Sequence, residues 1–242
     1  MKFNREIKGI LFDSGKVLNK PSSGHWFISP EFFQYVDEEK FKHVDKKKVS
    51  LAFKKANEYI NEQNVVADKE SEYNFFVNFY KIFLQNLPEL NTDDKIAEML
   101  ANDLVYNAEK YEFYDDAIKV IPKLKEKYKL GIVSDAWPSL LDVYANKNLD
   151  GYFDCIVISS ILGVTKPNPK MYQTALNELE LSPQEVIFID DNLQNCRGAM
   201  KLGIKSILLC RNKWVYWGNK LKSLGKKYYV INNLEEIYKL FD

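Results

Sequence analysis

Residues that can take part in catalysis follow short apolar runs at several places in this 242-residue chain. Three runs end in acidic or hydroxyl residues, and the loop after another contains a lysine in the segment TKPNP. These residues are Asp13, Ser134 with Asp135, Lys166, and Asp190 with Asp191. Carboxylate oxygens are ligands that a hard divalent cation prefers, and a lysine can neutralise an anionic group. If the fold brings them together, the set could bind a metal ion and an anionic substrate.

The apolar runs are predicted to be strands of one sheet. In chain order they are IKGILF, LGIVS, CIVIS, EVIFID and KSILLC, with YYVI as a candidate for a last strand. The later runs alternate with segments of helical spacing, which implies right-handed βαβ crossovers. We therefore expect an α/β fold, with a doubly wound parallel sheet as a Rossmann-like core. Ligands bind beyond the carboxyl ends of the strands in such sheets, which is where the candidate residues fall.

A different pattern separates the first predicted strand from the others. From about residue 30 to residue 111, long charged segments carry apolar residues at helical spacing, so this stretch is predicted to be an inserted all-helical domain. The predicted boundaries are 1–20 and 112–242 for the core and 21–111 for the insert. Aromatic residues of the insert are expected to form its own core, and they are Tyr73, Phe76, Phe79, Tyr80 and Phe83.

Composition and charge argue against several classes of protein. Lys plus Arg and Asp plus Glu both number 34, so the formal net charge is zero and no nucleic acid is expected as a partner. The chain has no apolar stretch near the roughly 20 residues of a membrane helix and no signal peptide pattern, so we expect no membrane partner and a cytoplasmic location. Cys155, Cys196 and Cys210 lack metal-ligand spacing and are expected to be reduced and structural. A small molecule is the expected partner.

Four motifs of the chain resemble the haloacid dehalogenase superfamily, in the family's order. They are FDSGKVL (12–18), VSDA (133–136), KPNPKMY (166–172) and FIDDNLQNCRGAMKLG (188–203). A single carboxylate at a strand end is usually a solvated loop residue or a helix cap, but four motifs in register argue against coincidence. The resemblance covers the predicted core, roughly residues 5 to 20 and 112 to 210, and says much less about the insert.

The resemblance implies a magnesium-dependent phosphatase that hydrolyses a small organic phosphate monoester. Asp13 would be the nucleophile and would form an aspartyl-phosphate that water later cleaves. Mg²⁺ would take oxygen ligands from Asp13, Asp191, Asp190 (directly or through water) and the backbone carbonyl of Gly15. Lys166 would neutralise the nucleophile and the transferring phosphoryl group.

The remaining motif residues have weaker assignments. The resemblance implies that the Ser134 hydroxyl binds a phosphoryl oxygen, helped by its own backbone N–H or that of Asp135. Asn195 lies where relatives carry a polar residue oriented toward the metal, and an amide on the helix surface is the competing interpretation. Lysines are usually surface residues. For Lys166, the Asn-Pro pair that follows in KPNP predicts an N-cap and a first helical position, which place the lysine near the strand ends.

Gly15 is the main departure from the family pattern. Most phosphatases of the family have an aspartate there, which protonates the leaving oxygen and later activates water. Dehalogenases of the family also lack it but use no metal, so the Asp190–Asp191 pair favours phosphoryl chemistry. His25 and Lys16, in the segment that usually forms a mobile flap, are candidates for the missing acid. Packing in an aromatic setting is the competing interpretation of His25.

Other functions stay open. A phospho-ligand binding or regulatory protein with little turnover would agree with Gly15, and phosphomutases, phosphonatases and dehalogenases share the fold. By resemblance the insert is a mobile helical cap, which closes over the site and selects the substrate. The basic and aromatic stretch 211–227 could serve in packing, in a dimer contact or as a phosphate-steering patch.

Overall fold

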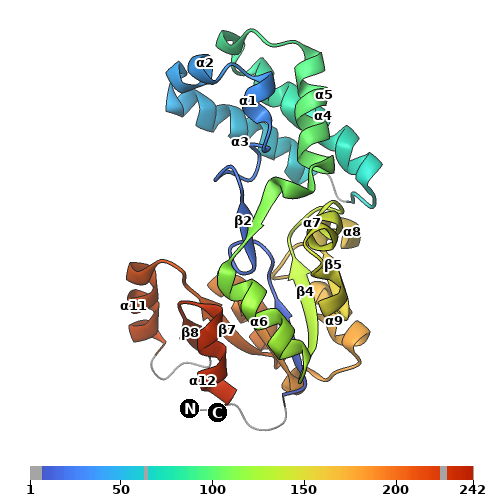
Figure 1. The fold of residues 1–242 in the computed structure, drawn as a ribbon, viewed down its shortest axis with the longest axis vertical. Helices are drawn as coiled ribbons and strands as arrows, with labels where there is room; N and C mark the ends of the chain where they lie inside the picture. The colour runs from blue at the N-terminus through green and yellow to red at the C-terminus, as the bar shows by residue number, and fades with distance from the viewer. Residues whose placement is uncertain (1–6, 63–64, 224–227, 242) are drawn as a thin grey trace. The chain divides into compact units, whose positions relative to one another are not determined.

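The chain forms two compact units, as a computed structural model that describes residues 7–62, 65–223 and 228–241 shows (Figure 1). The first unit comprises Met1–Lys20, Phe113–Ala136 and Lys147–Asp242, and the second comprises Pro21–Glu112 and Trp137–Asn146. Each unit has its own cluster of buried apolar side chains.

The first unit is built on a parallel sheet. Its strand order is β5-β4-β1-β6-β7-β8, and every described pair of neighbours is parallel. The strands are β1 (Gly9–Phe12), β4 (Lys129–Ser134), β5 (Cys155–Ile158), β6 (Val186–Asp190), β7 (Lys205–Leu209) and β8 (Tyr228–Ile231). The predicted α/β fold with a parallel, Rossmann-like sheet is confirmed, including the YYVI strand.

Strand register determines which residues meet at the carboxyl edge. Phe12 at the end of β1 pairs with Ile132 of β4 on one side and with Ile189 of β6 on the other. Asp13 directly follows Phe12, and Asp190 directly follows Ile189. Strand β4 ends at Ser134, two residues after Ile132. Because parallel neighbours run in the same direction, the last residues of the three central strands lie at one edge of the sheet.

Helices pack on this sheet. The most extensive of these contacts are those of α9 (Pro169–Leu179) with β4 and β5, of α10 (Leu193–Lys201) with β6 and β7, and of α11 (Lys213–Lys222) with β8. Helix α6 (Asp115–Lys125) also contacts β4. Asn168 is the N-cap of α9, with its side chain accepting from the N–H of Lys170, and Pro169 is the first helical residue, as predicted. Shorter elements are η3 (Asp150–Tyr152), α8 (Ser159–Leu162), η4 (Pro183–Glu185), η5 (Leu234–Ile237) and α12 (Tyr238–Phe241).

The second unit is helical. Its described elements are α1 (Phe32–Tyr35), α2 (Glu38–His43), α3 (Lys46–Glu62), α4 (Lys69–Gln85), η1 (Pro88–Leu90), α5 (Asp94–Tyr106), η2 (Ala108–Lys110) and α7 (Leu140–Asn146). Asp68 and Asp93 are N-caps of α4 and α5, each accepting a backbone N–H. Four of the five aromatic residues predicted to form its core are buried, and Tyr73 packs against them half-buried.

The observed units and the predicted domain ranges differ in where residues 137–146 belong. The prediction assigned this segment to the core domain, whereas it clusters with the helical unit. The Trp137 ring lies 4.8 Å from that of Phe75 and 5.1 Å from that of Phe76, between centroids. The Ser139 N–H donates to the buried carboxylate of Glu72 at 2.7 Å. These tertiary contacts, which local periodicity does not encode, explain the difference.

The chain passes between the units at β2 (Asn19–Pro21) and β3 (Tyr111–Phe113), which pair as a two-stranded sheet, and again on either side of residues 137–146. None of the helices in the described ranges combines the length and apolar composition that crossing a bilayer requires.

Candidate active site

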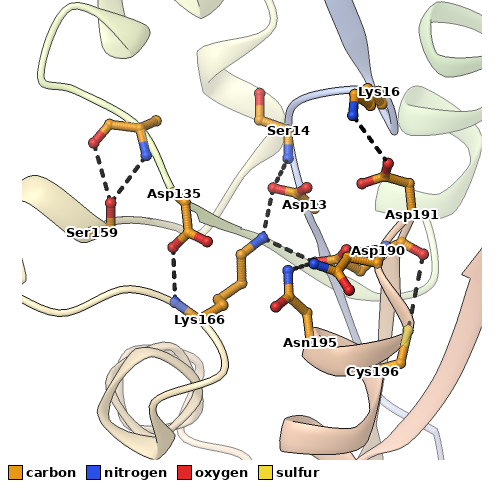
Figure 2. Close-up of polar contacts among 12 residues, drawn as sticks. Asp13, Ser14, Lys16, Asp135, Ser159, Lys166, Asp190, Asp191, Asn195 and Cys196 are labelled. Carbon is orange, nitrogen blue, oxygen red and sulfur yellow. Dashed lines mark hydrogen bonds and ion pairs between the residues drawn. The ribbon is translucent and has the colours of Figure 1, made fainter. Parts of the chain in front are cut away.

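The first unit brings several of the predicted residues together at the carboxyl edge of its sheet (Figure 2). Lys166 lies between two carboxylates, with its Nζ 2.7 Å from Oδ1 of Asp13 and 2.9 Å from Oδ2 of Asp190. Asp13, Asp190 and Asp191 each present an oxygen within 4.8 Å of the others. Residues far apart in the sequence thus form one cluster of charged groups.

Asp13 is held through one of its two carboxylate oxygens. Oδ1 accepts the Lys166 ammonium and also the N–H of Ser14, at 2.7 Å. The Asp13 N–H donates to the Ile189 carbonyl of β6 at 2.8 Å, which anchors the residue to the neighbouring strand. Burial raises the pKa of Asp13 to about 7 against the opposing effect of Lys166, and the Asp190 carboxylate adds to the increase.

Lys166 is positioned through its backbone as well as its side chain. Its N–H donates to Oδ1 of Asp135 at 2.8 Å, so the loop after β4 fixes the loop that carries the lysine. Its side chain is only 1% exposed, and burial lowers the pKa of an ammonium. Here the nearby carboxylates of Asp13 and Asp190 outweigh burial and raise the pKa of Lys166, so it is a fixed cation.

Asp190 is fully buried and has protein partners on both oxygens. Oδ2 accepts from Lys166 and from the side-chain amide of Asn195 at 3.0 Å, and Oδ1 accepts the N–H of Asn192 at 2.7 Å. Asn195 is itself buried on α10, and its backbone carbonyl accepts a hydrogen bond from the Tyr172 hydroxyl at 2.9 Å. Its amide therefore orients Asp190 and does not lie on the helix surface.

Asp191 lies on the more exposed side of the cluster. Burial and the neighbouring Asp190 carboxylate raise its pKa. The Nζ of Lys16 is 3.8 Å from its Oδ2, and Lys16 adopts a left-handed backbone with φ of 61°. Gly15 is not among the described residues with positive φ, so the unusual backbone of this turn is at Lys16.

The donor set of this cluster fits a hard divalent cation. Its three aspartates offer only oxygen ligands, which Mg²⁺ prefers. Counting Asp135, the cluster holds four carboxyl groups and the two ammonium groups of Lys166 and Lys16, so it carries excess negative charge when the carboxyl groups are ionised. A divalent cation would offset this excess.

Two predicted residues lie apart from these contacts. Ser134 is buried as the last residue of β4, at the same edge of the sheet. His25 belongs to the second unit, where its ring lies 4.5 Å from that of Phe53 between centroids and its Nδ1 accepts the N–H of Phe27. Burial lowers the pKa of His25. Its contacts agree with the packing interpretation.

The basic and aromatic stretch 211–227 contains both exposed and buried side chains. Its residues 224–227 lie outside the described part of the chain. Trp214 is 88% exposed, Trp217 is 60% exposed and Leu221 is 69% exposed, whereas Tyr216 is buried and packs in a cluster with Cys196 and Cys210. Arg211 instead makes several hydrogen bonds within the first unit. A dimer contact or a steering patch on α11 stays a prediction.

Some contacts of the site residues are not predicted from the sequence. The contact of the Asp135 carboxylate with the Lys166 N–H is not predicted from the sequence, and the expected role of the Asp135 backbone N–H at the phosphate stays a prediction. Asn192 was not singled out, although an Asn directly after an acidic strand end is a recognisable N-cap signal. All three cysteines are buried free thiols, as expected.

The chain belongs to the haloacid dehalogenase-like hydrolase family, whose match covers residues 31–209. Over 218 residues it is 26% identical to the glyceraldehyde 3-phosphate phosphatase of Pyrococcus furiosus, a match that covers 82% of this chain and 88% of that protein.

Solved structures with the same fold include enzymes of two kinds. A HAD phosphatase from Thermococcus onnurineus is 21% identical with a TM-score of 0.64, and the match covers 97% of each chain. The L-2-haloacid dehalogenase of Xanthobacter autotrophicus is 18% identical with a TM-score of 0.62, covering 97% of this chain and 98% of that one. At these identities the likeness shows the fold, and the site residues must decide the function.

Proposed function

We propose that this protein is a magnesium-dependent phosphatase that hydrolyses a small organic phosphate monoester through an aspartyl-phosphate on Asp13. The observation that carries the proposal is the Asp13–Lys166–Asp190 contact, with Asp191 beside it. A buried ammonium directly on a carboxylate suits a reaction in which an anion attacks an anion. The phosphatase relative is consistent with this chemistry.

The metal would be held by Asp13, Asp191 and the backbone carbonyl of Gly15. Asp190 is less suited to direct coordination because three donors already occupy its oxygens. Its contribution would be negative charge and a link through water. When bound, Mg²⁺ would supply positive charge to the phosphoryl oxygens.

In the proposed reaction, a carboxylate oxygen of Asp13 attacks the phosphorus, and the bond from phosphorus to the ester oxygen breaks. The leaving group departs as an alkoxide or phenoxide, which takes up a proton from solvent. Water then attacks the phosphorus of the aspartyl-phosphate and gives up a proton to solvent, the bond to the Asp13 oxygen breaks, and inorganic phosphate leaves with the carboxylate restored. Lys166 stays protonated throughout and neutralises charge on the transferring group. The Ser134 hydroxyl would donate to a phosphoryl oxygen.

One observation favours a second candidate, a phospho-ligand binding protein with little turnover. Gly15 has no side chain to donate a proton to the leaving group, and the contacts of His25 are aromatic packing. Such a protein would bind the phosphate ester at the same cluster and release it unchanged.

An aryl phosphate assay with and without Mg²⁺ separates the candidates. The phosphatase releases the phenol only with the metal, and Asp13→Asn abolishes release because an amide is not a nucleophile, while the fold is kept because the amide has nearly the same volume. Turnover by purified Asp13→Asn would refute the covalent mechanism. Calorimetric binding of a phosphate mimic without any turnover would identify the binding protein. Chloride release from a 2-haloacid in excess chelator would instead identify a dehalogenase.

A further inference from the structure

Arg211 joins three parts of the first unit through its guanidinium. Its Nε donates to the carbonyl of Lys16 at 3.1 Å, and its Nη2 donates to the carbonyl of Val17 at 2.7 Å. Nη1 and Nη2 bind the two oxygens of Asp116 at 3.0 and 2.9 Å. The guanidinium carbon also lies 3.6 Å from the centroid of the Tyr114 ring. This fork geometry requires arginine, because lysine has a single nitrogen.

The two carbonyls belong to the turn that follows the nucleophile. Within that turn the Lys16 N–H donates to the Asn19 carbonyl at 2.6 Å, and the N–H groups of Leu18 and Asn19 donate to the Ser14 carbonyl at 2.8 and 3.1 Å. The Asn19 side-chain amide donates to the Ser14 hydroxyl at 2.7 Å. Residues 14–19 therefore form a closed hydrogen-bonded turn.

Asp116 is itself held in place by the fold, so it is a fixed partner for the guanidinium. The Asp116 side chain is 13% exposed on the first turn of α6, and its Oδ2 also accepts the N–H of Leu234 at 2.8 Å. Arg211 follows β7 by two residues. The turn after β1 is thereby attached to α6, to the end of β7 and to the start of η5.

We propose that Arg211 is a positioning residue for catalysis, which fixes the turn that carries the Gly15 carbonyl and holds the Lys16 ammonium 3.8 Å from Asp191. This inference rests on the proposed function, because it assigns a task in the reaction at Asp13. Lys16 has a left-handed backbone, which is costly for a residue with a side chain and persists where its surroundings hold it. The bond from Arg211 to the Lys16 carbonyl is one of the contacts that hold it.

The test compares Arg211→Lys with a structural control. Arg211→Lys keeps the positive charge beside Asp116 but cannot reproduce the four hydrogen bonds of the guanidinium, because its three N–H donors are on a single nitrogen. The control is Lys125→Met, which removes a partly exposed ion pair with Asp154 (2.6 Å) at the opposite end of β4, away from the turn. Asp116→Asn keeps the arginine and weakens its anchor.

For Arg211→Lys we expect kcat on an aryl phosphate to fall roughly tenfold to a hundredfold, with KM within about twofold, because small displacements of catalytic groups are costly. Hydrogen exchange of peptides covering residues 14–19 should accelerate. Asp116→Asn should move both readouts in the same direction by less. Lys125→Met should lower the unfolding midpoint while leaving kcat and exchange at 14–19 as in the wild type.

Wild-type kcat together with wild-type exchange at 14–19 in Arg211→Lys would overturn the proposal. So would a loss of activity in Lys125→Met equal to that in Arg211→Lys, because it would show a general effect of stability. If the wild type hydrolyses no phosphate ester, the proposed function fails, and unchanged exchange in Arg211→Lys would then refute the positioning of the turn independently.

Discussion

Lys166→Met tests the central contact of the site. The lysine side chain is 1% exposed and joins a carboxylate that is 12% exposed to one that is fully buried. Removing one partner of a buried ion pair generally costs about 3–5 kcal/mol, because the remaining charge stays buried. Asp13 would keep the Ser14 N–H, and Asp190 would keep its bonds to Asn192 and Asn195. Since neither carboxylate is left without a donor and methionine fills a similar volume, we expect a loss near the lower limit, about 3 kcal/mol.

The assay for this prediction is urea unfolding of wild type and variant in excess chelator, with turnover measured in parallel. Turnover should fall at least roughly 10²- to 10³-fold, as for the loss of one donor that stabilises a developing anion. Combining Lys166→Met with Asp190→Asn should destabilise less than the sum of the two changes, because the second removes a charge that the first leaves unpaired. A variant within about 0.5 kcal/mol of wild type, a typical surface effect, would refute the reasoning, and so would near-normal turnover.

Three further predictions concern the metal, the leaving group and the second unit. Asp191→Ala should weaken Mg²⁺ binding in a calorimetric titration more than Asn195→Ala does, and equal losses would contradict the ligand assignment. General acid catalysis typically contributes roughly 10²- to 10⁴-fold, and the enzyme with Gly15 should lose this factor on alkyl phosphates, whose leaving groups need a proton, but not on nitrophenyl phosphate. Gly15→Asp should reduce the difference in rate between the two substrates. Similar wild-type rates on both substrates would show that an acid is already present. Burial lowers the pKa of Lys110 to about 8 although Glu72 is 4.0 Å away, and burial raises the pKa of Glu72, so both groups are shifted toward their neutral forms. Between pH 8 and roughly 10.5 the unfolded chain holds the Lys110 proton and the folded one does not, so wild type should gain up to about 3 kcal/mol over Lys110→Met as pH rises through this window, and parallel unfolding curves would contradict this.

Much of the site could be predicted because its residues share one simple property. Asp13 and Asp190 each stand at the end of an apolar run, and parallel strands bring such ends to one edge of a sheet. Lys166 could be found because the Asn-Pro pair after it marks the start of a helix. These signals are local and need no knowledge of tertiary contacts.

The other contacts depend on loops that meet only in the folded chain. The bond from the Lys166 N–H to Asp135 joins residues 31 positions apart, and no spacing rule predicts it. Residues 137–146 follow a core strand but pack in the helical unit because Trp137 fits beside Phe75 and Phe76. Arg211 lies in a stretch that looks like an exposed basic patch, and only the fold brings it to the turn after Asp13.

At position 15, the backbone could serve the metal while the side chain serves as the acid, so the two tasks can be lost or kept independently. A ligand taken from the main chain does not depend on the side chain, so a glycine can keep the carbonyl that would bind the metal. General acid catalysis does depend on it, because a proton must come from a group within hydrogen-bond reach of the leaving oxygen. Since positive φ occurs at Lys16 and not at Gly15, an aspartate at position 15 would not need a left-handed backbone. The turn can therefore offer the proposed carbonyl ligand with either residue, and in the proposed mechanism the choice of residue affects which leaving groups can depart.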